Sequence, residues 1–368
     1  MKTDYLIVGA GLSGLYIAHQ LEKMGKSFRI IEARDRIGGR ILSHPIIDPA
    51  ADLSSFDSVD MGPSWFWPQM HPRITQLIDN LMLPIFPQYS QGAYLLENQQ
   101  NSAPIRYESG FEQSPTSMRI AGGMQSLVDS LLTSLPTNKV QLKSTVTQIE
   151  HKENGYSYVS VTHNNRQDII ETTHVIFALP LRLLANSIAF TPSLPTEVKH
   201  HFKSTSTWVA AHAKLFAVYN TPFWQKEGLS GSASSHIGPL AEIHDASTFD
   251  GIGALFGFVG VDAATRIKAG DLLIKQAAIE QLTRIFGEQA NHPIDVKLID
   301  WSQEPYTATI EDHQAPTTHP RYGLPSAAKL LGQLHWYFAG TEAAQENGGY
   351  LEGALESADA VISALNLH

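Results

Sequence analysis

The chain has 368 residues, of which 43% are hydrophobic and 17% charged, as is usual for a globular protein with an extensive core. Its formal net charge is −10 and it has no run of Lys or Arg, which argues against nucleic acid and anionic membrane surfaces as partners. Cysteine is absent, which excludes disulfides, thiol catalysis and cysteine metal sites. No apolar stretch is long enough to cross a bilayer, and we expect a cytoplasmic protein without a membrane anchor.

The first predicted unit is a strand, a glycine turn, a helix and a second strand. Tyr5-Leu6-Ile7-Val8 is a short apolar run typical of a strand buried on both faces of a parallel sheet. Gly9-Ala10-Gly11-Leu12-Ser13-Gly14 follows with the spacing G-x-G-x-x-G, and an amphipathic helix extends to about Gly25. Phe28–Ile31 is the next strand, and it ends on Glu32. This order predicts a dinucleotide site.

Each residue type in this unit has a physical reason. Gly9 permits the tight turn, Gly11 leaves room for a pyrophosphate, and Gly14 lets the helix pack close to the strand. The helix opens on Leu12 and Ser13, and its free N–H groups suit a diphosphate. Glu32 is placed to bind a ribose and would repel a 2′-phosphate, so NADP is disfavoured and NAD or FAD remains.

The segment from Glu32 to Arg40 resembles the E-A-x-x-R-x-G-G-R element of the flavin-dependent amine oxidase family, which includes monoamine and polyamine oxidases. The resemblance implies FAD as the cofactor. It assigns to FAD binding the residues Glu32, Ala33, Arg34, Gly38, Gly39 and Arg40, with Arg40 forking onto phosphate oxygens. Related monoamine oxidases attach FAD through a cysteine, so in this cysteine-free chain we expect noncovalent FAD.

Val59–Trp65 resembles the D-x-G-x-x-W element of the family, where the backbone passes the flavin ring. The residues that this implies at the cofactor are Gly62, Pro63, Ser64 and Trp65. The run Trp65-Phe66-Trp67 fits ordinary core packing as well as it fits a site lining. A helix is predicted over 72–83, and the mixed stretch up to Pro115 is a short insertion that predicts a small cover over the site.

The middle of the chain returns to the first domain with a helix and then strands. Strands are predicted over 140–149, 156–162 and 169–177, with a hairpin turn at Asn154-Gly155. The family resemblance implies that Val146 lies beside the adenine and that Ala178 ends a strand at the cofactor.

The segment 208–219 alternates as a strand does, and 277–286 has helical spacing. Lys214, with Pro222-Phe223-Trp224 downstream, resembles the lysine and P-F-W element of amine oxidases. The resemblance implies that this lysine holds a water at flavin N5. The alternative is a sheet-edge lysine without a chemical role.

The C-terminal part carries the second dense match. Trp336–Glu342 and Gly348–Ala354 resemble the Y-F-A-G-T-E and G-Y-x-E-G-A elements of the family. The implied cofactor contacts are Gly340, Thr341, Glu342, Gly349, Tyr350, Leu351 and Ala354, with Tyr350 as one wall of an aromatic cage. Tyr306 and Trp301 are both candidates for the second wall, because Trp301–Tyr306 resembles W-x-x-E-x-Y.

The chain is therefore identified as a short member of the amine oxidase family with an α/β fold. We expect a Rossmann-like FAD-binding domain, consisting of a doubly wound parallel sheet and a β-meander, with an interleaved α+β substrate domain. The expected FAD-binding domain comprises residues 1–72, 116–190 and 325–368, and the substrate domain comprises 73–115 and 191–324.

The expected activity is oxidation of a hydrophobic or arylalkyl primary amine to an imine, by hydride transfer to flavin N5 with O2 reduced to H2O2. An L-amino-acid oxidase is disfavoured because Gly62–Trp67 contains no arginine for a carboxylate, although Arg106 or Arg119 could supply one from elsewhere. A carotenoid-type FAD desaturase and a non-catalytic FAD-binding protein would share the same fold and are rival functions. The expected partners are the amine and O2, with no metal, and the protein is expected to be a monomer or homodimer.

Overall fold

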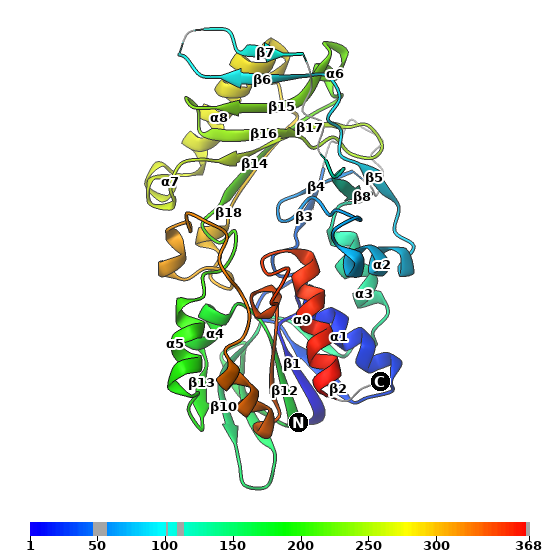
Figure 1. The fold of residues 1–368 in the computed structure, drawn as a ribbon, viewed down its shortest axis with the longest axis vertical. Helices are drawn as coiled ribbons and strands as arrows, with labels where there is room; N and C mark the ends of the chain where they lie inside the picture. Colours follow the sequence, from blue (N-terminus) through cyan, green and yellow to red (C-terminus); the bar gives the residue numbers. More distant parts are fainter. Residues whose placement is uncertain (47–56, 101, 109–113, 366–368) are drawn as a thin grey trace.

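The computed structural model describes residues 1–46, 57–100, 102–108 and 114–365, which form two large sheets (Figure 1). The first sheet has the order β13-β10-β11-β12-β1-β2-β9, and β19 also pairs with β12. Its strands are β1 Lys2–Val8, β2 Phe28–Ile31, β9 Val140–Gln141, β10 Ser144–His151, β11 Ser157–His163, β12 Arg166–Ala178, β13 Ala189–Thr191 and β19 Trp336–Ala339. Strand β1 pairs in parallel with β2 and with β12, and β12 also pairs in parallel with β19. Strands β10, β11 and β12 form an antiparallel meander. The expected α/β class with a Rossmann-like sheet is confirmed.

The central strand β1 is buried on both faces. Tyr5 and Ile7 pack into the cluster formed with α1 and α9, whereas Leu6 and Val8 pack into the cluster on the opposite face. The helices are α1 Leu12–Lys23, α2 Pro72–Asn80, α3 Gln125–Thr133, α4 Leu181–Ser187, α5 Thr196–Ser204, α6 Phe223–Lys226, α7 Ala263–Ala269, α8 Asp271–Phe286 and α9 Leu351–Ala364. Apolar burial on both faces is the main stabilising contribution to such a layered sheet.

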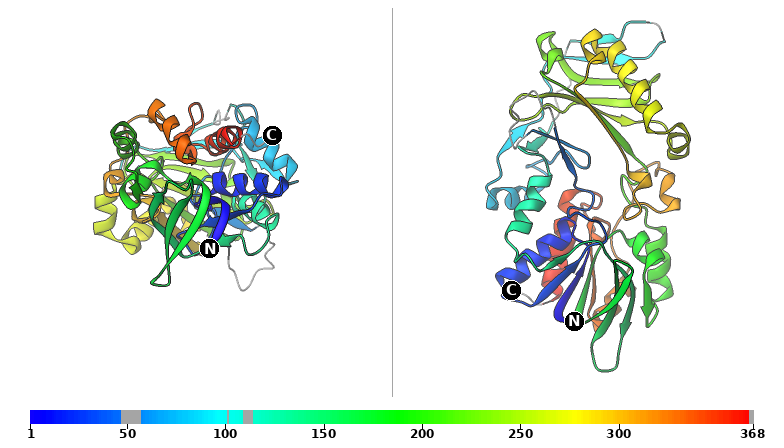
Figure 2. Two further views of the ribbon diagram at one scale, coloured as in Figure 1. Left: turned by 90° about the horizontal axis from the view of Figure 1, so that it is seen from below. Right: turned by 180° about the vertical axis from the view of Figure 1, so that it is seen from behind.

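The second sheet has the order β18-β14-β17-β16-β15-β6-β7 and is covered on one side by α8 (Figure 2). Its strands are β6 Ala93–Glu97, β7 Ile105–Tyr107, β14 Ala213–Tyr219, β15 Leu229–Ser235, β16 Leu240–Asp245, β17 Gly253–Val259 and β18 Asp295–Asp300. Two short antiparallel pairs lie outside these sheets, β3 Ser43–Pro45 with β4 Ser58–Asp60, and β5 Ile85–Pro87 with β8 Met118–Ile120.

Two predicted strands differ from the structure. The strand expected over 208–219 begins only at Ala213, because Val209 has φ +60° and the chain turns there. That left-handed conformation is strained for a β-branched residue, and alternation in the sequence gives no sign of it. The strand expected over 140–149 is two strands, β9 and β10, because Lys143 also has a positive φ of 52° between them.

The two sheets are formed by interleaved segments of the chain, and the domain bounds expected from the sequence stay a prediction. Helix α2, which that prediction assigns to the substrate domain, packs through Ile74, Leu77 and Ile78 into the same core cluster as α1, α3 and α9. Leu83 also packs against that cluster. We therefore propose that the first domain extends to Leu83 and not to residue 72.

Candidate active site

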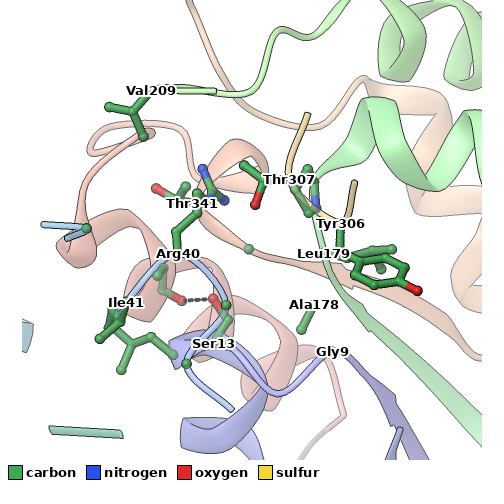
Figure 3. A pocket seen from close by; sticks show the side chains of 18 of the residues that line it. Gly9, Ser13, Arg40, Ile41, Ala178, Leu179, Val209, Tyr306, Thr307 and Thr341 are labelled. Atoms are coloured by element: carbon green, nitrogen blue, oxygen red, sulfur yellow. Dashed lines mark hydrogen bonds between the residues drawn. The ribbon is translucent and has the colours of Figure 1, made fainter. Parts of the chain in front are cut away.

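A cavity of about 380 Å³ is lined by residues of both sheets (Figure 3). One group of lining residues comprises the glycine turn after β1, the end of β2 and Tyr306 with Thr307; Glu32 contacts Ala10 and Arg34 contacts Thr307 within it, and we call it the dinucleotide end. A second group is linked by ring contacts that lead from Lys214 through Phe258, His212 and Trp208 to Tyr350, the last step through His319, and we call it the substrate end. Figure 3 shows Tyr306 on the opposite side of the pocket from Val209.

The glycine turn opens directly into this pocket. Gly11 is the N-cap of α1, which has no side-chain cap, so the first N–H groups of the helix have no intrahelical partner. A Cβ on Gly11 would meet only the Gly38 carbonyl oxygen, at 3.9 Å. Gly38 in turn donates its N–H to the Ala10 carbonyl at 2.8 Å, so the second glycine pair runs beside the first. Bare backbone on two sides of an uncapped helix start fits a diphosphate group.

Glu32 and Arg34 are fixed next to this turn. Glu32 is buried and accepts hydrogen bonds from the N–H groups of Ala10, at 2.7 Å, and Arg34, at 2.9 Å. The Arg34 guanidinium donates to the Thr307 hydroxyl at 2.7 Å, but its buried Nε has no partner. An anchored carboxylate with remaining lone pairs and an unpaired buried donor fit the polar part of a dinucleotide, such as a ribose.

Arg40 makes a two-pronged ion pair with Glu342, with Nη1 to Oε1 at 2.6 Å and Nη2 to Oε2 at 3.0 Å. The side chain of Glu342 is 1% exposed. Removing Arg40 would leave this carboxylate buried and uncompensated, which typically costs about 3–5 kcal/mol. The fork that the resemblance assigns to a phosphate is thus turned toward Glu342 in this structure.

The other residues expected at the cofactor divide between the pocket surface and the layer behind it. Gly14 and Glu342 are not on the pocket surface. Those that line it are Gly9, Gly11, Leu12, Ser13, Glu32, Ala33, Arg34, Gly38, Gly39, Arg40, Gly62, Pro63, Ser64, Trp65, Val146, Ala178, Gly340, Thr341, Gly349, Tyr350, Leu351 and Ala354. The four expected catalytic residues, Lys214, Tyr350, Tyr306 and Trp301, also line it.

Lys214 points from β14 into the segment 60–64. Its Nζ donates to the carbonyls of Asp60, at 3.0 Å, and Gly62, at 2.8 Å, and it lies 3.0 Å from the Ser64 hydroxyl oxygen. The centre of the Phe256 ring is 4.4 Å from Nζ, and Lys214 is only 5% exposed. These contacts fix the amine at the pocket wall.

Burial lowers the pKa of Lys214 to about 7; Asp60 partly opposes this shift and Arg119 adds to it. An ammonium has three N–H donors and no lone pair, so the three protein acceptors use all the donors of the charged form. In the neutral form two N–H groups serve the carbonyls and the lone pair accepts from Ser64. A water that bonds directly to Lys214 would therefore have to displace the Ser64 hydroxyl. Otherwise the water would bond to that hydroxyl, which in turn bonds to Lys214. The expected water contact at N5 stays a prediction.

Tyr350 lies at the substrate end, and its ring neighbours are not the expected Tyr306 or Trp301. Its ring neighbours are Trp67 at 6.3 Å, His71 at 5.5 Å and His319, stacked at 5.5 Å and 8°. Tyr306 lies at the other end, with the Arg34 guanidinium 5.6 Å from its ring centre.

Trp301 is 2% exposed and donates its Nε1–H to the Met61 carbonyl at 3.1 Å, next to the Lys214 acceptors. Among the described residues, no ring pair joins Tyr350 to Tyr306 or Trp301.

His71, Trp208 and His212 are among the pocket residues that lie outside the motifs of the sequence. His212 is two positions from Lys214, which in an extended segment puts both on one face, so this signal was present. Nothing local marked the other two. The run 65–67 serves both as site lining and as core packing. Trp65 and Trp67 line the pocket, whereas Phe66 is fully buried in the core.

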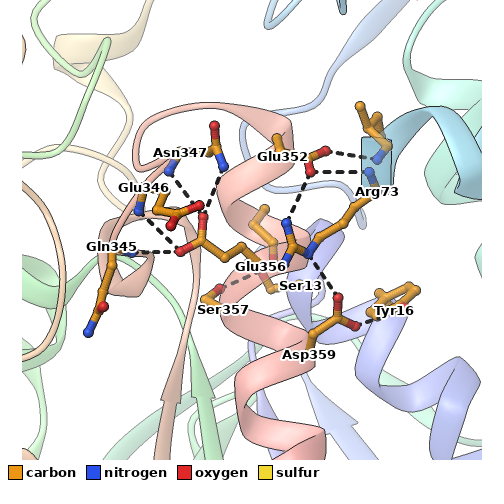
Figure 4. A network of polar contacts seen from close by, with 12 residues as sticks. Ser13, Tyr16, Arg73, Gln345, Glu346, Asn347, Glu352, Glu356, Ser357 and Asp359 are labelled. Carbon is orange, nitrogen blue, oxygen red and sulfur yellow. Dashed lines mark hydrogen bonds and ion pairs between the residues drawn. The ribbon is translucent and has the colours of Figure 1, made fainter. Parts of the chain in front are cut away.

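Acidic residues of α9 bind the start of α2 and the segment 345–347 (Figure 4). The buried Glu352 accepts from the backbone N–H groups of Arg73 and Ile74, at 3.1 and 2.9 Å, and so caps α2. Glu356 accepts from the N–H groups of Gln345, Glu346 and Asn347 and from Nδ2 of Asn347. The turn that leads to Tyr350 is therefore tied to the helix that follows it.

The comparisons with known proteins agree with this geometry. A family model described as flavin containing amine oxidoreductase matches residues 85–361, and one described as NAD(P)-binding Rossmann-like domain matches residues 7–81. The chain belongs to the flavin-containing amine oxidoreductase family. It is a flavin-dependent amine oxidoreductase, and its cofactor is FAD.

Similar proteins span the length of the chain. A probable flavin-containing monoamine oxidase A from Dictyostelium discoideum is 25% identical over 96% of this chain and 95% of its own. Putrescine oxidase from Kocuria rosea is 23% identical over 96% and 93%. The solved structure of cyclohexylamine oxidase from Brevibacterium oxydans IH-35A superposes with a TM-score of 0.77 at 20% identity, covering 99% of both chains, which shows that the fold is shared.

Within the described ranges, no helix is both long and apolar enough to cross a membrane. The same residues contain no group of three or more His, Cys, Asp or Glu side chains arranged to hold a metal ion.

Proposed function

We propose that this family member oxidises a hydrophobic or arylalkyl primary amine to an imine, with O2 as the electron acceptor and H2O2 as a product. The observation that carries the proposal is the composition of the substrate end. It is lined by aromatic side chains, namely Trp65, Trp67, Trp208, Phe258, Trp301 and Tyr350. Among the described residues that line the pocket, Glu32 is the only carboxylate, and it lies at the dinucleotide end.

A substrate carboxylate would find no arginine among the described residues at this end, and the Nζ of Lys214 is already engaged by Asp60, Gly62 and Ser64. Arg119 is buried, with its two Nη atoms donating to the carbonyls of Ser247, at 2.7 Å, and Ala246, at 3.1 Å, and it does not line the pocket. Arg106 is 43% exposed on β7 and pairs with Glu108. Burying an unpaired carboxylate costs several kcal/mol, so an α-amino acid is a poor substrate.

The same composition disfavours a diamine. The second ammonium of putrescine or spermidine needs an anionic or strongly polar wall when it loses its hydration. The aromatic faces near Tyr350 suit one ammonium or one aromatic ring, through contacts of about 1–2 kcal/mol when desolvated. This supports a monoamine.

When bound, FAD supplies an electron-poor N5 that accepts a hydride. The pocket residues orient the amine, and Lys214 holds a hydrogen-bonding group at the wall. In this proposal Tyr350, with Trp67 and His71, forms the aromatic boundary that positions the amine. Tyr306 contacts the nucleotide side instead.

A peroxide-coupled assay tests the function. It compares tryptamine, phenethylamine and tyramine with tryptophan, phenylalanine, tyrosine and spermidine. Each arylalkyl amine is expected to exceed its amino acid in kcat/KM by about 100-fold or more, which corresponds to about 3 kcal/mol of unpaired carboxylate burial. An amino acid that outperforms its decarboxylated counterpart would contradict the proposal. Spermidine at the head of the series would point to polyamines.

We also expect FAD to be released intact on denaturation, because the chain has no cysteine. Acid precipitation followed by chromatography of the supernatant measures the released FAD. Flavin that stays in the pellet would reveal a covalent bond to another residue, such as a histidine.

A further inference from the structure

The side chain of Tyr350 is oriented by ring contacts and not by a hydrogen bond of its own. Its backbone is fixed, because the Tyr350 carbonyl accepts from the Thr341 hydroxyl at 2.8 Å and its N–H donates to the Asn347 carbonyl at 3.2 Å. Among the described residues, none bonds to the Tyr350 hydroxyl, and the residue is 42% exposed. The orientation of this ring at the substrate end therefore depends on the rings that pack against it.

His319 makes a face-to-face contact with Tyr350. The two ring centres are 5.5 Å apart and the rings are within 8° of parallel, whereas Trp67 meets Tyr350 at 86° and His71 at 50°. A group held between two ring faces needs about 3.5 Å from each, or a gap of about 7 Å. The two rings are too close for an amine to lie between them. His319 therefore covers one face of Tyr350 and leaves the other face open to contact.

The covered face is the one turned away from the pocket. Of these two described residues, Tyr350 lines the pocket and His319 does not. His319 belongs to the irregular segment 314–325, and its own ring is held in place. Its ring centre is 4.6 Å from that of Trp208, and its Nδ1 is hydrogen-bonded to the Pro320 carbonyl at 3.0 Å.

Two glycines allow this segment to lie directly on the turn that leads into α9. A Cβ at Gly349 would lie only 3.0 Å from Nε2 of His319 and 3.2 Å from the Trp208 ring, and Gly349 has a φ of +89°. A Cβ at Gly348 would overlap the side chain of Tyr322, whose ring packs edge-on against that of His319 at 5.6 Å. The close approach of the His319 ring thus depends on bare backbone at the turn.

We propose that His319 is a positioning residue for the substrate amine. By covering the outer face of Tyr350, it fixes that ring so that the pocket face meets the amine. His319 acts through Tyr350 and does not touch the substrate. This inference rests on the proposed oxidation of a monoamine. It also accounts for how Tyr350 can orient an amine although neither Tyr306 nor Trp301 packs against it.

Binding of an amine that cannot be oxidised gives the first measurement. The probe is 2-phenyl-2-propylamine, which has no hydrogen on the carbon next to nitrogen, and calorimetry on the holoenzyme gives its Kd. His319→Ala is expected to raise this Kd about three- to tenfold, because the freed Tyr350 ring must then be immobilised when the amine binds. His319→Phe keeps a flat ring over Tyr350 and is expected to stay within about twofold of wild type.

Steady-state kinetics separate positioning from damage to the fold or to the cofactor site. For phenethylamine, His319→Ala is expected to raise KM by about the same factor and to keep kcat within about twofold, because Tyr350 contacts the bound amine and the transition state alike. The ratio of flavin to protein absorbance is expected to be unchanged. Thr318→Ala, at the preceding exposed position of the same segment, is the matched control and is expected to change none of these values.

A double-mutant cycle assigns the effect to Tyr350. In a Tyr350→Ala background, His319→Ala is expected to have no further effect on the Kd of the probe, because the ring that it positions is gone. In a Trp208→Ala background the effect is expected to remain. A loss that persists in Tyr350→Ala and disappears in Trp208→Ala would overturn the proposal and assign the role to Trp208.

Equal Kd values for wild type and His319→Ala would also overturn the assignment, as would equal losses in His319→Ala and His319→Phe. Wild-type enzyme that binds and oxidises no monoamine would contradict the proposed function itself. Wild-type enzyme that oxidises phenethylamine, with an unchanged affinity in His319→Ala, would contradict only the role of His319. The two failures are thereby separate.

Discussion

Lys214→Met is expected to retain FAD and to slow turnover by about 100- to 1000-fold, the range seen when one preorganised donor is removed from a reacting site. The methionine keeps the apolar stem near Phe256 but leaves nothing to bond the Asp60 and Gly62 carbonyls or Ser64. Rapid mixing with an amine under anaerobic conditions measures flavin reduction, and mixing of the reduced enzyme with O2 measures reoxidation. We expect reoxidation to carry the larger loss.

The pH dependence of reoxidation is a second measurement on the same variant. Because the pKa of Lys214 is about 7, a step that uses the ammonium is expected to slow as pH rises through 7, and this inflection should vanish in Lys214→Met. Lys297→Met is the matched control, since Lys297 lies opposite Phe216 on the neighbouring strand and pairs with Asp295. Equal rates for wild type and Lys214→Met in both half-reactions would remove Lys214 from the mechanism.

Gly14→Ala is expected to weaken FAD binding by about tenfold or more and to reduce the yield of folded protein. A Cβ at this position would overlap the Gly9 carbonyl oxygen and lie 3.3 Å from the Ala178 side chain. The helix would have to move away from the turn, and overpacking of this kind costs about 1–3 kcal/mol. That range corresponds to roughly a five- to 150-fold change in affinity if it falls entirely on the bound state.

Flavin absorbance relative to protein absorbance and the melting temperature measure the effect of Gly14→Ala. The control is Gly332→Ala, because a Cβ at Gly332 meets no atom within 4 Å and its φ is not in the left-handed region. Stoichiometric FAD and an unchanged melting temperature in Gly14→Ala would show that the close contact with Gly9 is not needed.

The parts of the fold that the sequence predicts well are those set by local patterns. The unit from Tyr5 to Glu32 needs only an apolar strand, a glycine turn and an amphipathic helix, and each has a signal within a few residues. The turn at Val209 has no such signal, because a valine in an alternating segment favours a strand, and only the tertiary surroundings hold it at a positive φ.

Site residues within one continuous motif could be predicted from the sequence. Contacts between residues from distant segments could be predicted less well. The partner of Arg40 is Glu342, 302 residues away, and the sequence contains both residues without indicating that they pair. The ring neighbours of Tyr350 likewise include His71 and His319, which lie far apart from each other in the sequence. Spacing in the sequence fixes neighbours on one element but not the packing between elements.

The tie between Glu356 and Asn347 also affects the chemical lifetime of the enzyme. Asn347 precedes Gly348, a pair in which the glycine nitrogen attacks the asparagine side chain and converts it to aspartate. Glu356 holds both the backbone N–H and the Nδ2 of Asn347, and this restrains the side chain from the rotation that the reaction needs. If Asn347 did become aspartate, its carboxylate would face that of Glu356 and release the turn before Tyr350. The same pair at Asn154-Gly155 lies in an exposed hairpin far from the pocket, so ageing of the protein should begin where it leaves catalysis intact.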